Sequence, residues 1–340
     1  MTIQAYIVRR IALAVLVLFG VATITFLMVR LVPSDPAAVY VGSNARPAQI
    51  AQARKDLGLD RPLYVQYGIY MSDLVRGQWG DSLRTKRPVL QDILHFLPSS
   101  LELILAALIL ATVVGVILGV TTARRKGKWI DHVMRFFSTG GVAIPAFWLA
   151  MMLQILFFRM LHLLPVAGQT DIIVSQLHPI TQITGMPVVD ALITGNWPAF
   201  TDAVRHLVLP MLALAAYPTG VIMRMTRSAM LEAMGNDYIR MARAMGVPAR
   251  TLLYKDALKN AMGPVLTVIG LTFAYSLTGT FFIELVFAWP GLGYYSTTSI
   301  LSLDYPAIMG VTVTVAIAYV LVNLVVDLAQ ALLDPRIALS

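Results

Sequence analysis

The chain contains no cysteine. This absence excludes a disulfide framework, a thiolate metal site and a cysteine nucleophile. Charged residues are also scarce, at 13% of 340 residues, whereas apolar residues make up 58%. A soluble protein of this composition would expose apolar patches that aggregate, so we expect an integral membrane protein.

Motifs for nucleotide, metal and covalent chemistry are missing as well. The fragment nearest to a phosphate-binding loop, residues 127–129, lacks the required glycine spacing and the hydroxyl residue. No nucleophile elbow is present, and the five histidines are scattered at positions 95, 132, 162, 178 and 206. We therefore predict a chain that is not an enzyme and that binds no metal or cofactor of its own.

The net charge of +8 could indicate a nucleic-acid partner. The basic residues, however, lie in the connections between apolar runs, where membrane topology requires them. We expect the lipid bilayer as a partner and no nucleic acid.

The long apolar runs predict the transmembrane segments. A helix needs about 20 apolar residues to cross the hydrocarbon layer. The first run follows Arg9 and Arg10 but precedes no small-residue cleavage site, so we interpret it as an uncleaved span rather than a signal peptide. The fourth is the shortest and contains Pro210 and Pro218. The fold class is thus all-α with six spans, at about 10–31, 100–122, 134–160, 206–223, 262–288 and 307–331.

The distribution of positive charge predicts the orientation. Basic residues concentrate between spans two and three and between spans four and five, whereas 289–306 has none. The positive-inside rule therefore places both basic loops and both termini in the cytoplasm. The predicted organisation is an N-terminal transmembrane helix (1–33), an external loop region (34–98) and a membrane core (99–333) with an external excursion (165–205) and a cytoplasmic region (224–261).

Few polar groups interrupt the predicted spans. Glu102, Glu284 and Asp327 lie near span ends, where an interfacial charge that snorkels or pairs is the simpler interpretation and coupling to an ion is the alternative. Gly115 and Gly119 have the spacing of a close helix-packing face. Four deeper polar residues could either bond between helices or line a translocation path: Gln154, Ser276, Thr280 and Asn323.

The cytoplasmic region contains a short basic amphipathic segment, residues 237–246. Helical spacing places Tyr238, Met241, Ala242 and Met245 on one face. Gly246 suits the position after a helix end, and Pro248 suits the first turn of a second helix. The charged residues Asp237, Arg240 and Arg243 occupy the other side. This segment could rest on anionic lipid or dock against a partner protein.

A series of motifs runs along most of the chain, at residues 31–36, 57–63 with 66–67, 80–82 with 88–89, 97–103, 144–148, 209–210, 224–232, 237–246, 284–293, 322–327 and 334–336. In order and spacing, these motifs resemble those of the inner-membrane permeases of ABC importers, in the dipeptide, oligopeptide and nickel group. Within the cytoplasmic segment, Ala242 and Gly246 match two positions of that family's signature, whereas Arg240 and Met241 depart from it.

The resemblance implies a type I ABC importer permease fold in a bacterial inner membrane. It implies that a coupling helix contacts a separate ATPase and that ATP and Mg²⁺ bind there. It further implies a related permease as heterodimer partner, two ATPase subunits and a periplasmic solute-binding protein. The coupling residues would be Asp237, Tyr238, Ile239, Arg240, Met241, Ala242, Arg243, Ala244, Met245 and Gly246.

Di- and tripeptides, or longer peptides, are the expected substrates, because the excursion at 165–205 resembles the dipeptide-type branch. The main alternative is an ion-coupled secondary transporter that acts without an ATPase, and a membrane-bound sensor or scaffold is a third hypothesis. Transport by this chain alone would favour the ion-coupled alternative.

Overall fold

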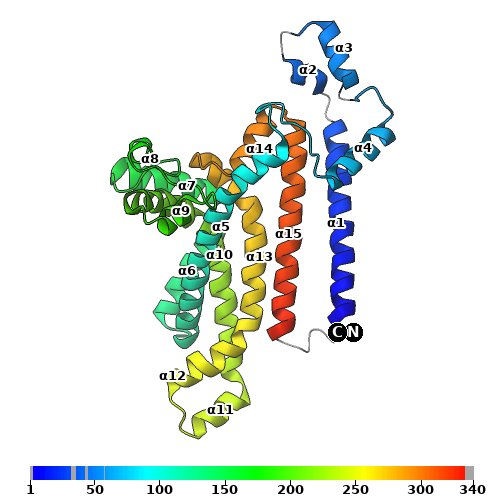
Figure 1. The fold of residues 1–340 in the computed structure, drawn as a ribbon. Coiled ribbons are helices and arrows are strands. Elements are labelled where there is room, and N and C mark those ends of the chain that lie inside the picture. Colours follow the sequence, from blue (N-terminus) through cyan, green and yellow to red (C-terminus); the bar gives the residue numbers. More distant parts are fainter. Residues whose placement is uncertain (1–2, 32–35, 43–44, 57, 334–340) are drawn as a thin grey trace.

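A computed structural model describes residues 3–31, 36–42, 45–56 and 58–333, and within these ranges the chain is helical with one isolated β-bridge, between Asp81 and Pro88. Among the described residues, five helical runs are long and apolar enough to span a membrane (Figure 1). They are α1 (Ile3–Leu31), α5 (Val89–Arg124), α10 (Trp197–Gly235), α13 (Leu258–Val286) with the turns that precede it, and α15 (Tyr305–Leu333).

The predicted third span is not one straight helix. It divides into α6 (Trp129–Ala143) and α7 (Ala146–Leu153), which continues as the π-helical segment η1 (Gln154–Met160). The two parts are bent by 105°. Ile144 has an extended backbone, with ψ at 127°, because the ring of Pro145 disfavours helical geometry in the preceding residue. The described part of the chain therefore contains five helices long enough to span a membrane, or six spans if the bent pair is one span.

Two other predicted boundaries are corrected. The fourth span is not the shortest, because α10 runs for 39 residues and contains Pro210 and Pro218. The second begins earlier than residue 100, because α5 starts at Val89 and continues through Pro98. In both cases the predicted bounds followed the apolar run, which stops at polar residues. The helix itself continues through those polar residues.

The remaining helices are short and lie at the two ends of the bundle. At one end α11 (Asp237–Ala244) and α12 (Ala249–Thr251) form a projection, and we call this the α11 end. We call the opposite end the α14 end. The short helices toward it are α2 (Pro36–Val41), α3 (Pro47–Asp56), α4 (Leu63–Val75), α8 (Ile172–Leu177), α9 (Pro187–Ile193) and α14 (Leu292–Leu301).

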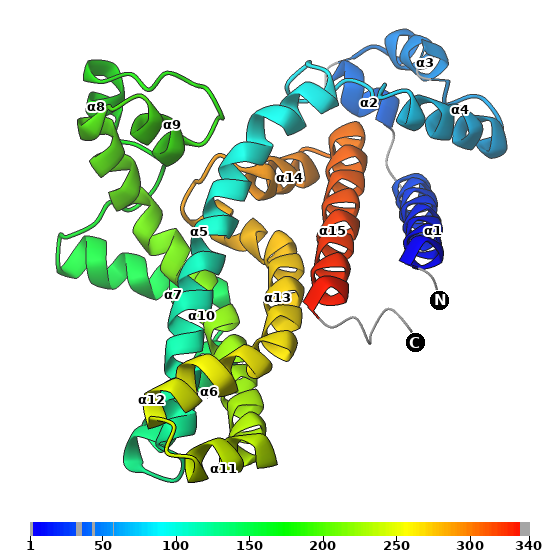
Figure 2. The ribbon, with the colours of Figure 1, turned by 60° about the horizontal axis from the view of Figure 1, so that its bottom comes forward.

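The centre of the bundle is the packing of α10 against α5 and α13 (Figure 2). Gly115 and Gly119 of α5 face Ile222 and Thr226 of α10, and a Cβ atom at Gly119 would lie 2.5 Å from the Cβ of Thr226. This contact confirms the predicted close-packing face. Helix α1 lies apart from this centre, at the edge of the bundle beside α15.

Candidate functional site

Helix α11 is joined to the membrane helices by short connections. Asn236 alone separates it from the end of α10. After α11, residues 245–248 lead into α12, which continues through the π-helical segment η2 (Leu252–Ala257) into α13. The predicted second helix is therefore the beginning of the fifth span, and Pro248 is its N-cap residue. A displacement of α11 must move the ends of α10 and α13 with it.

The end of α11 confirms the predicted role of Gly246 in the backbone. Gly246 has φ at +82°, a conformation that glycine adopts without a Cβ clash. Its N–H donates to the carbonyl of Arg243 at 3.1 Å, and the N–H of Val247 donates to the carbonyl of Ala242 at 3.1 Å. This pair of bonds is the Schellman motif, which satisfies the last carbonyls of a helix and reverses the chain.

One face of α11 is buried in the protein. Ile239 is 1% exposed, and the partly buried Ala242 lies one turn further along the same face. Ile239 belongs to a buried cluster that we call the α11 base, and Ala242 packs against it. The buried members of the base are Val120, Ala123, Ala229, Met230, Ala233, Ile239, Leu252, Leu253, Ala257 and Ala261. The base joins α5, α10 and α13, so α11 is fixed to all three.

The opposite face of α11 exposes three apolar side chains. Tyr238, Met241 and Met245 are 42%, 64% and 68% exposed. Of the four residues predicted on this face only Ala242 is turned toward the base, because it follows Ile239 by three residues and so lies on the same side of the helix. Tyr238 is also held in place, since its hydroxyl accepts a 2.7 Å hydrogen bond from the amide of Asn260. We call Tyr238, Met241 and Met245 the α11 outer face.

The charged residues of α11 are solvated. Arg240 and Asp237 form an ion pair of 3.4 Å whose side chains are 73% and 96% exposed. Such a pair contributes little to stability. Arg243, Ala244 and Gly246 are exposed too, so this part of the helix is open to a partner.

A buried ion pair ties α6 to α10 near the α11 end. Arg227 donates through its Nε and one terminal nitrogen to the two carboxylate oxygens of Asp131, each at 2.8 Å. Asp131 is 1% exposed and accepts a third bond from the N–H of Gly127 at 3.1 Å. A bidentate pair of this kind fixes orientation as well as distance. Sequence reasoning missed its role, although Arg227 lies in one of the motifs.

The four residues predicted to line a path are placed as follows. Gln154 donates to the carbonyls of Val166 at 2.8 Å and Val286 at 3.1 Å. Ser276 and Thr280 are 3% and 1% exposed and bond to carbonyls of their own helix, α13. Asn323 is partly buried in α15. The structure does not bring these four together, and their role in transport stays a prediction.

Glu284 and Glu102 are buried within the chain and hydrogen-bonded there, so neither side chain snorkels to the surface. Glu284 is 0% exposed. It accepts hydrogen bonds from the hydroxyl of Ser100 at 2.6 Å and from the N–H groups of Gly293 and Tyr294 at 2.7 and 3.1 Å. These amides belong to the first turn of α14, where a carboxylate is favoured by the helix dipole. The side chain of Asp327, the third predicted charge, lies outside the described residues.

Glu102 differs from Glu284 in its hydrogen bonds. It is 5% exposed and accepts a 2.8 Å bond from the N–H of Val188 on one oxygen, whereas its other oxygen is buried without a partner. Glu102 thus attaches α5 to α9. Its partner, Val188 in the first turn of α9, is 86 residues away in the chain, so no pattern in the sequence could have revealed the contact.

Comparison with known proteins identifies the family. Residues 115–339 match the model of the binding-protein-dependent transport system inner membrane component, and residues 3–104 match the model of its N-terminal region. The chain belongs to this family.

Its relatives are permeases of similar length. A probable D,D-dipeptide transport system permease protein of Escherichia coli (strain K12) is 46% identical over 95% of this chain and 94% of its own. A dipeptide transport system permease protein of Alkalihalophilus pseudofirmus is 41% identical over 98% of this chain and 99% of its own. A di/tripeptide transport system permease protein of Pseudomonas aeruginosa is 40% identical, with 98% of both chains covered.

Membership confirms several of the predictions. The chain is a multi-pass membrane permease subunit of an ABC transport system, and its role is transport rather than catalysis. This supports the ABC permease over the ion-coupled alternative. By the family's description, such a system depends on a binding protein.

Proposed function

We propose that this permease moves di- and tripeptides from the periplasm to the cytoplasm and that separate ATPase subunits drive it through α11. The observation that carries the proposal is the construction of α11. It exposes an apolar outer face, while Ile239 fixes it to a base shared by three membrane helices. A helix that docks in a groove is recognised by apolar side chains at this spacing.

The connections of α11 support a mechanical role. Because one residue links it to α10 and four link it to α12, movement of an ATPase groove would be transmitted to α10 and α13. These two helices pack against each other at the centre of the bundle, so they would move together. Rigid-body rocking of this kind gives alternating access.

The substrate assignment is supported by the relatives, whose names specify dipeptide, D,D-dipeptide or di/tripeptide transport. The proposed assembly contains this chain, a related permease, two ATPases that bind ATP and Mg²⁺, and a periplasmic binding protein. We place the path between the two permeases, with Gln154, Ser276, Thr280 and Asn323 as candidates to contact it in another conformation.

The orientation follows from charge. The α11 end carries the basic loops, including Arg124, Arg125 and Lys128, so we place it in the cytoplasm. Helix α1 begins, and α15 ends, toward this end, which puts the two termini in the cytoplasm as well.

The proposal is tested with proteoliposomes that contain the complex purified with this chain. Uptake of a labelled dipeptide is expected only when ATP is enclosed with the ATPases and the binding protein is added outside. Uptake that proceeds without ATP, driven by a proton or sodium gradient, would reject the proposal. Uptake of a different solute under the same ATP dependence would reject only the substrate.

A further inference from the structure

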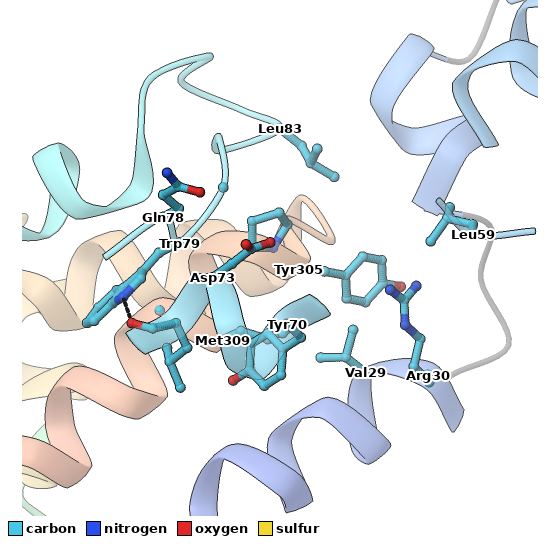
Figure 3. A pocket seen from close by; sticks show the side chains of 14 residues that line it. Val29, Arg30, Leu59, Tyr70, Asp73, Gln78, Trp79, Leu83, Tyr305 and Met309 are labelled. Atoms are coloured by element: carbon cyan, nitrogen blue, oxygen red, sulfur yellow. Dashed lines mark hydrogen bonds between the residues drawn. The ribbon is translucent and has the colours of Figure 1, made fainter. Parts of the chain in front are cut away.

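A cavity at the α14 end of the bundle lies where the end of α1 meets α4 and α15. Its volume is about 240 Å³, and its walls come from the end of α1, from α4, from the turn after α4 and from the first turns of α15 (Figure 3). The lining residues are Val29, Arg30, Leu59, Tyr70, Asp73, Leu74, Gln78, Trp79, Gly80, Leu83, Tyr305, Pro306, Met309 and Gly310.

The cavity combines apolar walls with one charge of each sign. Figure 3 shows Val29 and Arg30 on one side and Trp79 on the other, with Tyr70 and Met309 between them. The indole of Trp79 is fixed by a 3.2 Å hydrogen bond to the carbonyl of Leu74. Apolar walls with a few polar groups are typical of a site for an amphiphilic ligand.

Three of the lining residues, Arg30, Asp73 and Tyr70, have polar groups that can bind a ligand. Arg30 has its guanidinium carbon 5.5 Å from the centre of the Phe26 ring, and the structure records no ion pair between Arg30 and Asp73. The hydroxyl of Tyr70 is buried without a hydrogen-bond partner, although buried hydroxyls normally have one. Burial, together with the neighbouring Tyr67, raises the pKa of Tyr70 to about 12, so the hydroxyl remains a donor.

The cavity lies at the end of a membrane-spanning segment, where lipid headgroups are expected. Arg30 is the last residue of the first membrane-spanning segment. Helix α4, which forms a wall, exposes Leu63, Tyr64 and Val75, at 59%, 78% and 85%. Exposed apolar and aromatic side chains next to a span end favour a position in the membrane interface. Away from the cavity, α1 and α15 lie side by side, and both are long and apolar enough to span a membrane.

We propose that this cavity binds a phospholipid whose headgroup carries a phosphate and a free ammonium group, as phosphatidylethanolamine does. Arg30 binds the phosphate, Asp73 accepts hydrogen bonds from the ammonium group, and Tyr70 donates to an oxygen of the phosphate or ester. The acyl chains follow the seam between α1 and α15. The lipid then completes the packing of α1, and this role is independent of the transported solute.

The test places the full-length chain, with the subunits that co-purify, in nanodiscs of equal parts phosphatidylethanolamine and phosphatidylcholine. Native mass spectrometry counts the lipids retained after extraction. Choline cannot donate to Asp73, so the wild-type protein is expected to retain phosphatidylethanolamine about tenfold over phosphatidylcholine, the factor that a charged hydrogen bond provides.

Variants separate the two contacts. Asp73→Asn is expected to reduce the ratio of the two lipids toward one, whereas Arg30→Gln is expected to reduce retention of both about tenfold. Val29→Trp keeps both charges but fills the cavity, so it is expected to expel both lipids. The matched control is Arg76→Gln, because Arg76 is exposed at the end of α4 and does not line the cavity.

Three results would overturn the proposal. They are equal retention of the two lipids by the wild-type protein, a loss in Arg76→Gln equal to that in Arg30→Gln, and displacement of the lipid by a short zwitterionic peptide. The last result would assign the same charges to a peptide. Melting temperatures close to that of the wild-type protein show that the variants are folded.

Discussion

At the residue scale, buried carboxylates organise the α14 end. Glu284 accepts bonds from the first turn of α14, and Asp304 accepts a 3.3 Å bond from the N–H of Ala307 in the first turn of α15. Asp304 is 0% exposed and also binds the hydroxyl of Ser82 and the N–H of Arg84. Each carboxylate therefore satisfies helix amides and attaches a distant segment.

Replacing Glu284 tests this role. Glu284→Gln presents an amide to groups that donate, so we expect a loss of about 1–3 kcal/mol in the free energy of unfolding. The matched control is Glu102→Gln, in which the second oxygen has no partner to lose. Thermal unfolding in detergent should show a clear decrease for Glu284→Gln and little change for Glu102→Gln. Equal decreases would contradict the assignment.

The loop before α9 depends on Asp190 and therefore on pH. Burial would raise the pKa of this carboxyl group, but bonds from Thr184, Ile183 and Gly185 outweigh burial and hold the pKa below its usual value. A lowered pKa stabilises the folded loop above the unfolded pKa of about 4, and this stability is lost as pH falls through the folded value.

Hydrogen exchange of residues 183–185, corrected for intrinsic rates, measures the effect. We expect protection to be constant from pH 7 to about 5 and to decrease below about 4. The variant Asp190→Asn should show weak protection that does not change with pH. A pH-independent wild-type loop would show that the charge of Asp190 does not hold it.

At the element scale, the backbone geometry of the turn after α11 can be tested without changing any side-chain contact. Nothing lies within 4 Å of a Cβ atom built at Gly246, so Gly246→Ala changes only backbone strain. We expect a loss of about 1–2 kcal/mol in stability at the α11 end and weaker coupling to ATP hydrolysis.

The control for that substitution is Gly235→Ala. Gly235 also has open space around it but has no left-handed conformation, so alanine should be neutral or slightly stabilising there. Thermal unfolding and ATP hydrolysis per transported solute are measured for both variants. If the two alanine variants behave alike, the Schellman turn does not determine how α11 is held.

Much of the element level was predictable from the sequence. Hydropathy located the long helices, and Gly246 marked the end of α11. Pro145 was a visible signal for the bend within 134–160, but a 27-residue apolar run outweighed it in the prediction. The contacts of Glu284 with Ser100 and of Asp131 with Arg227 could not be predicted, because each joins residues 96 or more apart in the chain.

At the scale of the whole molecule, α5, α10 and α13 form the centre, and α11 projects from it (Figure 1). Ser276 and Thr280 are enclosed within this chain, while Tyr275 and Phe282 of the same helix are 55% and 63% exposed. In the proposed assembly, this exposed side is available to the related permease. In the proposed mechanism, a separate ATPase displaces α11, and α11 in turn moves this centre.

The central claim is that the α11 outer face is where an ATPase binds, and ATPase affinity tests it most directly. The measurement compares binding of the purified ATPase subunits to nanodiscs containing wild-type permease or the double variant Met241→Asp with Met245→Asp. The matched control is Ile173→Asp with Leu177→Asp, an exposed pair of the same spacing on α8, toward the other end of the bundle. The account predicts at least tenfold weaker binding for the α11 variant, because two buried apolar contacts are lost, and wild-type binding for the control. Wild-type affinity and ATP turnover in the α11 variant would contradict it.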